Sequence, residues 1–64
     1  MDQEKTGKFI ARRRKEKGFT QAALGERLGV TDRAVSKWER GLCLPDAALM
    51  LPLCQLLGIT VNEL

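Results

Sequence analysis

Sixty-four residues form one domain at most, and a chain of this length buries only about 60% of its unfolded surface, which excludes a large core. Apolar residues at 44% and charged residues at 30% suit a small globular domain, and a net charge of +3 permits a polyanionic partner without demanding one. No run approaches the roughly 20 apolar residues of a membrane span, and the N-terminus is not a signal peptide, so we expect a cytoplasmic protein.

Residue types that bind metals or carry out acid–base catalysis are scarce. The chain has two cysteines, Cys43 and Cys54, but no CxxC pair and no histidine, so we expect no metal site and no cofactor. Without a secretory signal, free thiols are expected rather than a disulfide. The commonest general base is missing, and no nucleophile elbow, phosphate loop or paired-carboxylate motif is present. We therefore expect that the protein is not an enzyme.

The segments between the turn residues are typical of helices, and none alternates as a strand would. The first, residues 3–17, has an apolar stripe that contains Ile10, and Gly18 ends it. The second and third, residues 21–28 and 32–40, open at threonine N-caps and end at glycines. Three helices are therefore expected in the first forty residues.

The fourth segment, residues 47–57, is apolar on all sides and is expected to be the central buried helix. Pro52 lacks a backbone N–H and clashes with the preceding turn, so we expect an irregular turn near residues 46–51 with regular helix after it. A capping box that opens at Thr60 begins a fifth helix at residues 61–64. The residues expected to be buried together are Ile10, Leu24, Leu28, Val35, Trp38, Leu53, Leu57 and Ile59.

The second and third segments form two short helices around a tight turn. Gly29 suits a turn that needs a positive φ, and Gly25 lets a second helix approach closely because it has no side chain. This is the helix-turn-helix arrangement, in which Trp38 is expected in the core rather than stacked on a base. The apolar seam between the two helices consists of Leu24, Leu28, Val30, Val35 and Trp38.

The third helix has one packing side and one polar side when it is drawn at about 100° per residue. Its polar arc holds Asp32, Arg33, Ser36, Lys37 and Arg40. Arginine and lysine donate to guanine O6 and N7, serine pairs with either kind of base edge, and aspartate accepts from cytosine N4. We therefore predict that the first four of these residues read bases in the major groove. Arg40 and Thr31, at the rim, are predicted to contact the DNA backbone. A solvated helix face is the alternative interpretation.

A series of short motifs runs along the chain from residue 20 to residue 64. They are Thr20-Gln21, Leu28-Gly29-Val30-Thr31, Val35-Ser36-Lys37-Trp38-Glu39-Arg40-Gly41, Pro45-Asp46 and Leu57-Gly58-Ile59-Thr60-Val61-Asn62-Glu63-Leu64. As a set they resemble the phage-repressor/Cro-like (Xre-like) helix-turn-helix family, and the resemblance covers residues 6–64. It implies an all-α fold, a compact five-helix bundle of the lambda-repressor-like DNA-binding type. Helices 2 and 3 would form the helix-turn-helix, with the third as recognition helix.

For function, the resemblance implies binding of double-stranded DNA, usually as a homodimer on a palindromic operator. It implies that Gln21 contacts the DNA backbone or an edge base, and that Arg14 and Glu39 form a partly buried ion pair. The chain departs from the family at Thr6 and Arg13, where members more often carry apolar residues. An unpaired charge would be costly there, so the Arg13 stem is expected to lie on apolar surface with its head in water.

The basic run at residues 12–15 points in all directions from a helix, so it cannot act as one surface. Its side chains are either solvated or in contact with phosphates. We expect residues 1–64 to be one sequence-specific DNA-binding domain of a transcriptional regulator. The alternative function is a protein-interaction module of an antitoxin or a coactivator-like protein. A helix that is capped at Thr60 and ends at Leu64 also raises the alternative that this domain is the N-terminal part of a longer regulator.

Overall fold

The computed structural model describes residues 2–64, which form four α-helices and one short 3-10 turn. The elements are α1 (Gln3–Glu16), α2 (Gln21–Leu28), α3 (Asp32–Glu39), α4 (Ala47–Leu57) and η1 (Val61–Glu63). No strand occurs in this part of the chain, and the all-α prediction is confirmed. None of the described helices is long and apolar enough to cross a membrane.

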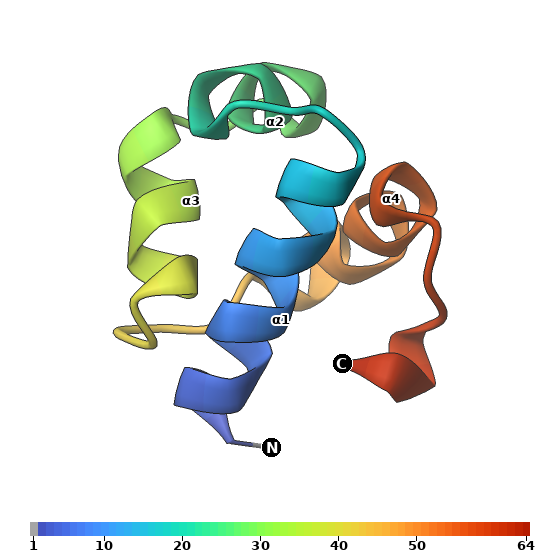
Figure 1. The fold of residues 1–64 in the computed structure, drawn as a ribbon. Coiled ribbons are helices and arrows are strands. Elements are labelled where there is room, and N and C mark those ends of the chain that lie inside the picture. Colours follow the sequence, from blue (N-terminus) through green and yellow to red (C-terminus); the bar gives the residue numbers. More distant parts are fainter. Residues whose placement is uncertain (1) are drawn as a thin grey trace.

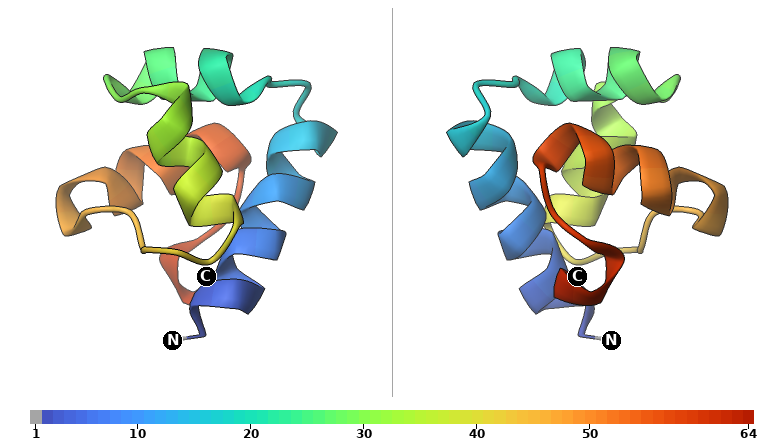
Figure 2. Two further views of the ribbon diagram at one scale, coloured as in Figure 1. Left: turned by 90° about the vertical axis from the view of Figure 1, so that its left-hand side faces the viewer. Right: turned by 90° about the vertical axis from the view of Figure 1, so that its right-hand side faces the viewer.

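The helices are arranged around one core. Helices α1 and α3 run side by side in opposite directions, and α2 lies across one end of the pair (Figure 1). Helix α4 packs behind them, and the chain then returns toward the start of α1, so that the two termini lie at the same end of the molecule (Figure 2). This arrangement leaves one side of α3 on the surface of the molecule.

Local signals set the ends of the two central helices as predicted. The Thr20 hydroxyl accepts from the Ala23 backbone N–H at 3.0 Å, and the Thr31 hydroxyl accepts from that of Ala34 at 3.2 Å. These N-caps satisfy donors that have no partner within the helix. Gly29 ends α2 with φ of +74°, a conformation that glycine adopts without steric cost.

The core agrees closely with the prediction. Of the eight expected residues, six are buried, and Leu28 and Ile59 are partly buried against them. Cys54 is buried as well, and burial, followed by the negative charge of Glu63, raises the pKa of its thiol. The thiol therefore stays protonated and acts as a small apolar side chain. Both cysteines are free.

The predicted irregular turn at residues 46–51 is wrong, because α4 is helical from Ala47 onward with Pro52 inside it. Proline at this position removes one hydrogen bond, the one that a backbone N–H would donate to the carbonyl of Ala48. Ala48 lies at an exposed position in the first turn, where solvent can satisfy the freed carbonyl. The helix therefore tolerates the proline without breaking.

The predicted fifth helix is also corrected: η1 is a single 3-10 turn. Its backbone bonds span three residues, from Glu63 N–H to the Thr60 carbonyl at 3.1 Å and from Leu64 N–H to the Val61 carbonyl at 3.2 Å. The Glu63 carboxylate accepts from the Thr60 backbone N–H at 2.8 Å, so the capping signal is used. The capping signal therefore opens a 3-10 turn rather than an α-helix.

The two polar positions on the α1 stripe have polar partners, although Nε of Arg13 is buried without one. Residue Thr6 is 3% exposed, and its hydroxyl donates to the Leu64 carbonyl at 3.2 Å. Arg13 Nη2 donates to the Leu57 carbonyl at the end of α4 at 2.9 Å, while its Nη1 bonds Glu16 at 3.0 Å. These side chains attach α1 to the C-terminal segment and take the place of apolar packing.

Candidate nucleic-acid interface

The turn between α2 and α3 is tight because Gly25 has no side chain. A Cβ built on Gly25 would lie 2.8 Å from the Val30 carbonyl oxygen and 3.1 Å from the Thr31 carbonyl carbon. The close approach is therefore made by the turn itself rather than by the body of the next helix. It fixes where α3 begins and how it projects from α2.

The side of α3 that faces away from the core gathers the predicted base-reading residues. We call the set Asp32, Arg33, Ser36, Lys37 and Arg40 the recognition face. All of its members are exposed except Ser36, which is half-buried. On the opposite side of the helix Val35 is fully buried and Trp38 is 5% exposed, so Trp38 belongs to the core. Burial of that side holds the recognition face toward solvent.

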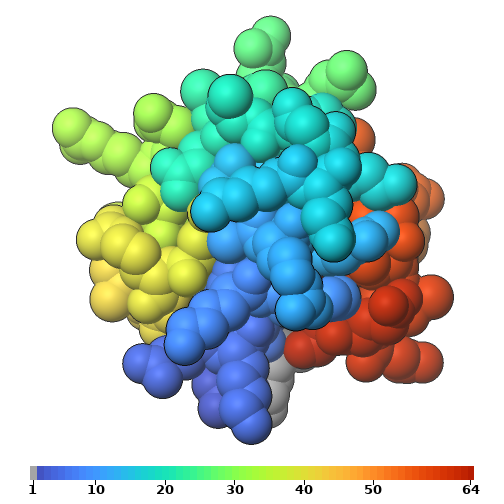
Figure 3. All heavy atoms as spheres, in the orientation of Figure 1, coloured from blue at the N-terminus to red at the C-terminus, as the bar shows by residue number. Residues whose placement is uncertain are grey.

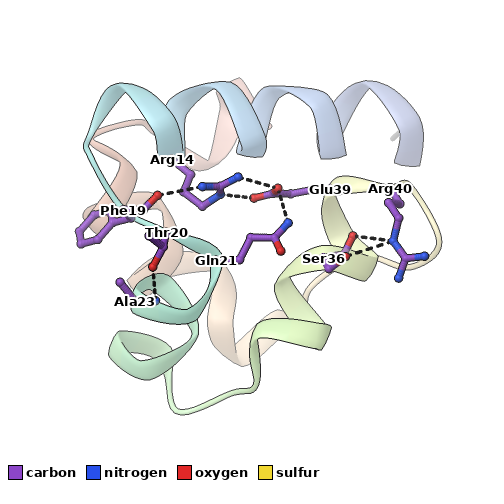
Figure 4. Close-up of polar contacts among 8 residues, drawn as sticks. All are labelled: Arg14, Phe19, Thr20, Gln21, Ala23, Ser36, Glu39 and Arg40. Carbon is purple, nitrogen blue, oxygen red and sulfur yellow. Dashed lines mark hydrogen bonds and ion pairs between the residues drawn. The ribbon is translucent and has the colours of Figure 1, made fainter.

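Ser36 and Arg40 lie one helical turn apart and are hydrogen-bonded. Arg40 Nε donates to the Ser36 hydroxyl oxygen at 3.1 Å and to the Ser36 carbonyl at 3.3 Å (Figure 4). This contact leaves the two terminal amino groups of the guanidinium free to bind an anion, and it leaves the Ser36 hydroxyl proton free to donate. The two side chains therefore form one hydrogen-bonding unit on the recognition face.

Arg14 and Glu39 form a largely buried ion pair between α1 and α3. Arg14 Nε lies 2.6 Å from Glu39 Oε2 and Nη2 lies 3.1 Å from Oε1, and the two side chains are 10% and 8% exposed. Arg14 Nη1 also donates to the Phe19 carbonyl at 2.8 Å, in the connection that leads to α2. One guanidinium thus joins α1, α3 and the α1–α2 connection.

Gln21 also forms a hydrogen bond to the carboxylate of this ion pair. Its side-chain amide donates to Glu39 Oε1 at 2.9 Å, so the carboxylate accepts from two residues at once (Figure 4). One amide hydrogen and the amide oxygen of Gln21 remain available to another molecule. The exposed Thr31 hydroxyl already caps α3, which leaves its own proton available as a donor.

Gly7 positions the recognition helix and was not predicted to do so. A Cβ at Gly7 would overlap the Trp38 carbonyl oxygen and lie 2.8 Å from that of Glu39, so the α1 backbone touches the C-terminal end of α3. A sequence signal did exist, because a glycine within a helical pattern weakens the helix by about 1 kcal/mol relative to alanine. The residue therefore controls how closely α1 and α3 pack.

Comparisons with known proteins point the same way as the geometry. The sequence profile of a helix-turn-helix family matches residues 10–64. An uncharacterized HTH-type transcriptional regulator, YazB of Bacillus subtilis, is 36% identical over 64 residues, which cover all of this chain and 93% of the relative. Repressor protein C2 of Salmonella phage P22 is 39% identical over 64 residues, which cover all of this chain and 30% of the repressor.

Solved structures of similar proteins share the fold. The P22 c2 repressor, in complex with a synthetic operator, superimposes with a TM-score of 0.86 at 36% identity, covering 91% of this chain and 88% of that one. The restriction-modification controller protein C.AhdI of Aeromonas hydrophila superimposes with a TM-score of 0.85 at 29% identity, covering 97% of this chain and 90% of that one. The helix-turn-helix of this chain is therefore embedded in the same fold as in these regulators.

Proposed function

Because this chain belongs to the phage-repressor/Cro-like (Xre-like) helix-turn-helix family, we propose that it binds double-stranded DNA sequence-specifically and regulates transcription. One observation carries the proposal: α3 is capped, fixed on its buried side by Val35 and Trp38, and presents a charged and polar face to solvent. A short helix of this kind fits the major groove of B-DNA. The family is one of DNA-binding regulators rather than a class of enzymes.

The roles of individual residues follow from their place on the surface. Asp32, Arg33, Ser36 and Lys37 reach base edges, because they lie on the projecting side of α3. The backbone contacts come from Gln21, Thr31 and Arg40, whose free donors lie at the edges of that side. Phosphate contacts set register and orientation, whereas base contacts carry the sequence preference.

The described helices pack around one core, and we propose that residues 1–64 act as one domain. One short helix reads only a few base pairs, so two copies on half-sites about one DNA turn apart are needed for useful specificity. We therefore propose a homodimer on DNA, in the cytoplasm. A protein-interaction module is the competing function.

Two alanine variants separate the proposed roles. Arg33→Ala is expected to lose about 1–3 kcal/mol on the preferred sequence and to relax the preference at one base pair. Arg40→Ala is expected to weaken binding to all sequences alike and to make the negative slope of log K against log salt shallower by about one unit. The measurement is binding of each variant to a preferred and a scrambled duplex over a salt series.

Glu26→Ala provides a control, since Glu26 is an exposed residue of α2 outside the recognition face and its loss removes a charge of the opposite sign. This variant should preserve the difference between preferred and scrambled duplexes. Equal losses on both duplexes for Arg33→Ala would reduce that residue to a backbone contact. If the wild-type chain binds no DNA at low salt, the protein-interaction function is favoured instead.

A further inference from the structure

The structure separates the basic run of α1 into two groups. Arg13 and Arg14 turn inward to hydrogen-bond partners, whereas Arg12 and Lys15 are exposed. Two more exposed cations precede them on the same helix. At about 100° per residue, four cations fall within an arc of about 80° on the solvent side of α1. We call this set the basic stripe: Lys5, Lys8, Arg12 and Lys15.

The basic stripe holds the positive excess of the whole chain. Four of the eleven lysines and arginines lie in it, and the other seven are outnumbered by eight acidic residues. No stripe cation forms an ion pair among the described residues, and Arg12 only packs over the Phe9 ring at 5.4 Å. The carboxylate of Glu16, at one edge of the stripe, is taken by Arg13 at 3.0 Å. Glu4 lies at the other edge, next to Gly41, and forms no ion pair with a stripe cation among the described residues. The four cations therefore have no carboxylate partner and can meet an external anion.

The basic stripe lies next to the recognition face, but the two surfaces face different directions. Helix α1 packs directly beside α3, as the contact at Gly7 requires, and the two helices run antiparallel (Figures 1 and 2). The side chains of α1 stand on the front of the molecule, and those of α3 project to its left (Figure 3). On the helical wheel, Lys8 and Lys15 lie closer than the other two cations to the side that α1 turns to α3.

The dimensions of DNA determine what would meet this surface. The major groove is about 12 Å wide, and an α-helix with its side chains is about 10–12 Å across. A helix that fills the groove leaves its immediate neighbour above one groove wall, which is a row of phosphates. Flexible lysine ammonium groups suit such a row, because they act as point charges and require no fixed geometry.

We propose that the basic stripe is a second, sequence-independent contact surface for DNA, which binds the phosphates of the strand bounding the groove that α3 enters. This inference rests on the proposed DNA-binding function. It assigns the nearer cations, Lys8 and Lys15, the larger share of the contact. An acidic protein is the competing occupant, but continuity with the recognition face favours the phosphates of the same duplex.

The test compares two double variants that remove the same charge. Lys8→Gln/Lys15→Gln changes the stripe, whereas Lys17→Gln/Arg27→Gln removes two exposed cations outside both surfaces. The stripe variant is expected to bind preferred and scrambled duplexes more weakly by the same factor. Its negative slope of log K against log salt is expected to be shallower by about 1–2 units than that of the control variant, as the loss of one or two phosphate contacts requires.

Circular dichroism and thermal melting of both variants verify that they remain folded, as expected for surface substitutions. Equal slopes and equal affinities for the two double variants would overturn the stripe proposal and leave the DNA-binding function intact. A loss confined to the preferred duplex would overturn it too, because phosphates carry no sequence. Absence of binding by the wild-type chain at low salt would instead remove the function on which the stripe depends.

Discussion

Replacing Glu39 with alanine is expected to lower the free energy of unfolding by about 3–5 kcal/mol, which is much of the stability of a small domain. The Arg14 side chain is only 10% exposed, and the variant would leave its guanidinium in the protein without a counter-charge. The remaining bond to the Phe19 carbonyl does not neutralise that charge. Gln21 would lose its acceptor as well. Urea unfolding of the variant and the wild type measures the difference.

The double variant Arg14→Met/Glu39→Leu is expected to recover much of this loss, because it replaces both charges with apolar groups of similar size. The exposed pair of Arg13 and Glu16 supplies the matched comparison, with side chains 26% and 52% exposed. Glu16→Ala should cost less than about 1 kcal/mol, since solvent screens that pair. A loss for Glu39→Ala no larger than that for Glu16→Ala would show that the buried pair does not stabilise the fold.

Replacing Gly7 with alanine is expected to destabilise the protein by about 1–3 kcal/mol, although the same change at an open helical site stabilises. The added methyl group would overlap the Trp38 carbonyl oxygen, and a backbone atom cannot move aside as a flexible side chain can. The shift would separate α1 from α3 and displace the recognition face. Thermal melting together with DNA affinity records both consequences.

Lys8→Ala is the control for the stability measurement, because residue 8 is the exposed neighbour of Gly7 on the same helix. Its melting temperature should change little, as is usual for surface substitutions. If Gly7→Ala melted at a higher temperature than the wild type, the close packing of α1 on α3 would be wrong. The position of α3 relative to α1 would then need revision.

Features encoded by a few neighbouring residues were predictable from the sequence. The threonine caps of α2 and α3, the left-handed glycine at the end of α2 and the apolar spacing of the core all lie within single segments. The prediction of an irregular turn failed at Pro52. Proline disrupts a helix interior, but here the carbonyl that loses its donor belongs to Ala48, in the exposed first turn of α4. The prediction of a fifth helix failed because a capping signal fixes where a turn begins but not how far it continues.

Contacts between distant segments were harder to predict. The role of Gly7 depends on carbonyl groups more than thirty residues away, and the acceptor of Arg13 Nη2 lies at the end of α4. Helical spacing placed Ser36 and Arg40 on one face, but not the hydrogen bond between them, which depends on side-chain conformation. Likewise, the resemblance to a family suggested the partner of Arg14, whereas the bond from Gln21 to the same carboxylate emerged only from the structure.

The central claim is that Asp32, Arg33, Ser36 and Lys37 of the recognition face read DNA sequence. The most direct test selects preferred duplexes in vitro and measures the affinity of the wild-type chain, free and as a covalently joined dimer, for the selected and scrambled sequences at one low salt concentration. The joined dimer is expected to prefer the selected sequence by about 10³-fold or more, with two half-sites about one turn apart. Equal affinity for both sequences, or no binding even at low salt, would contradict the claim.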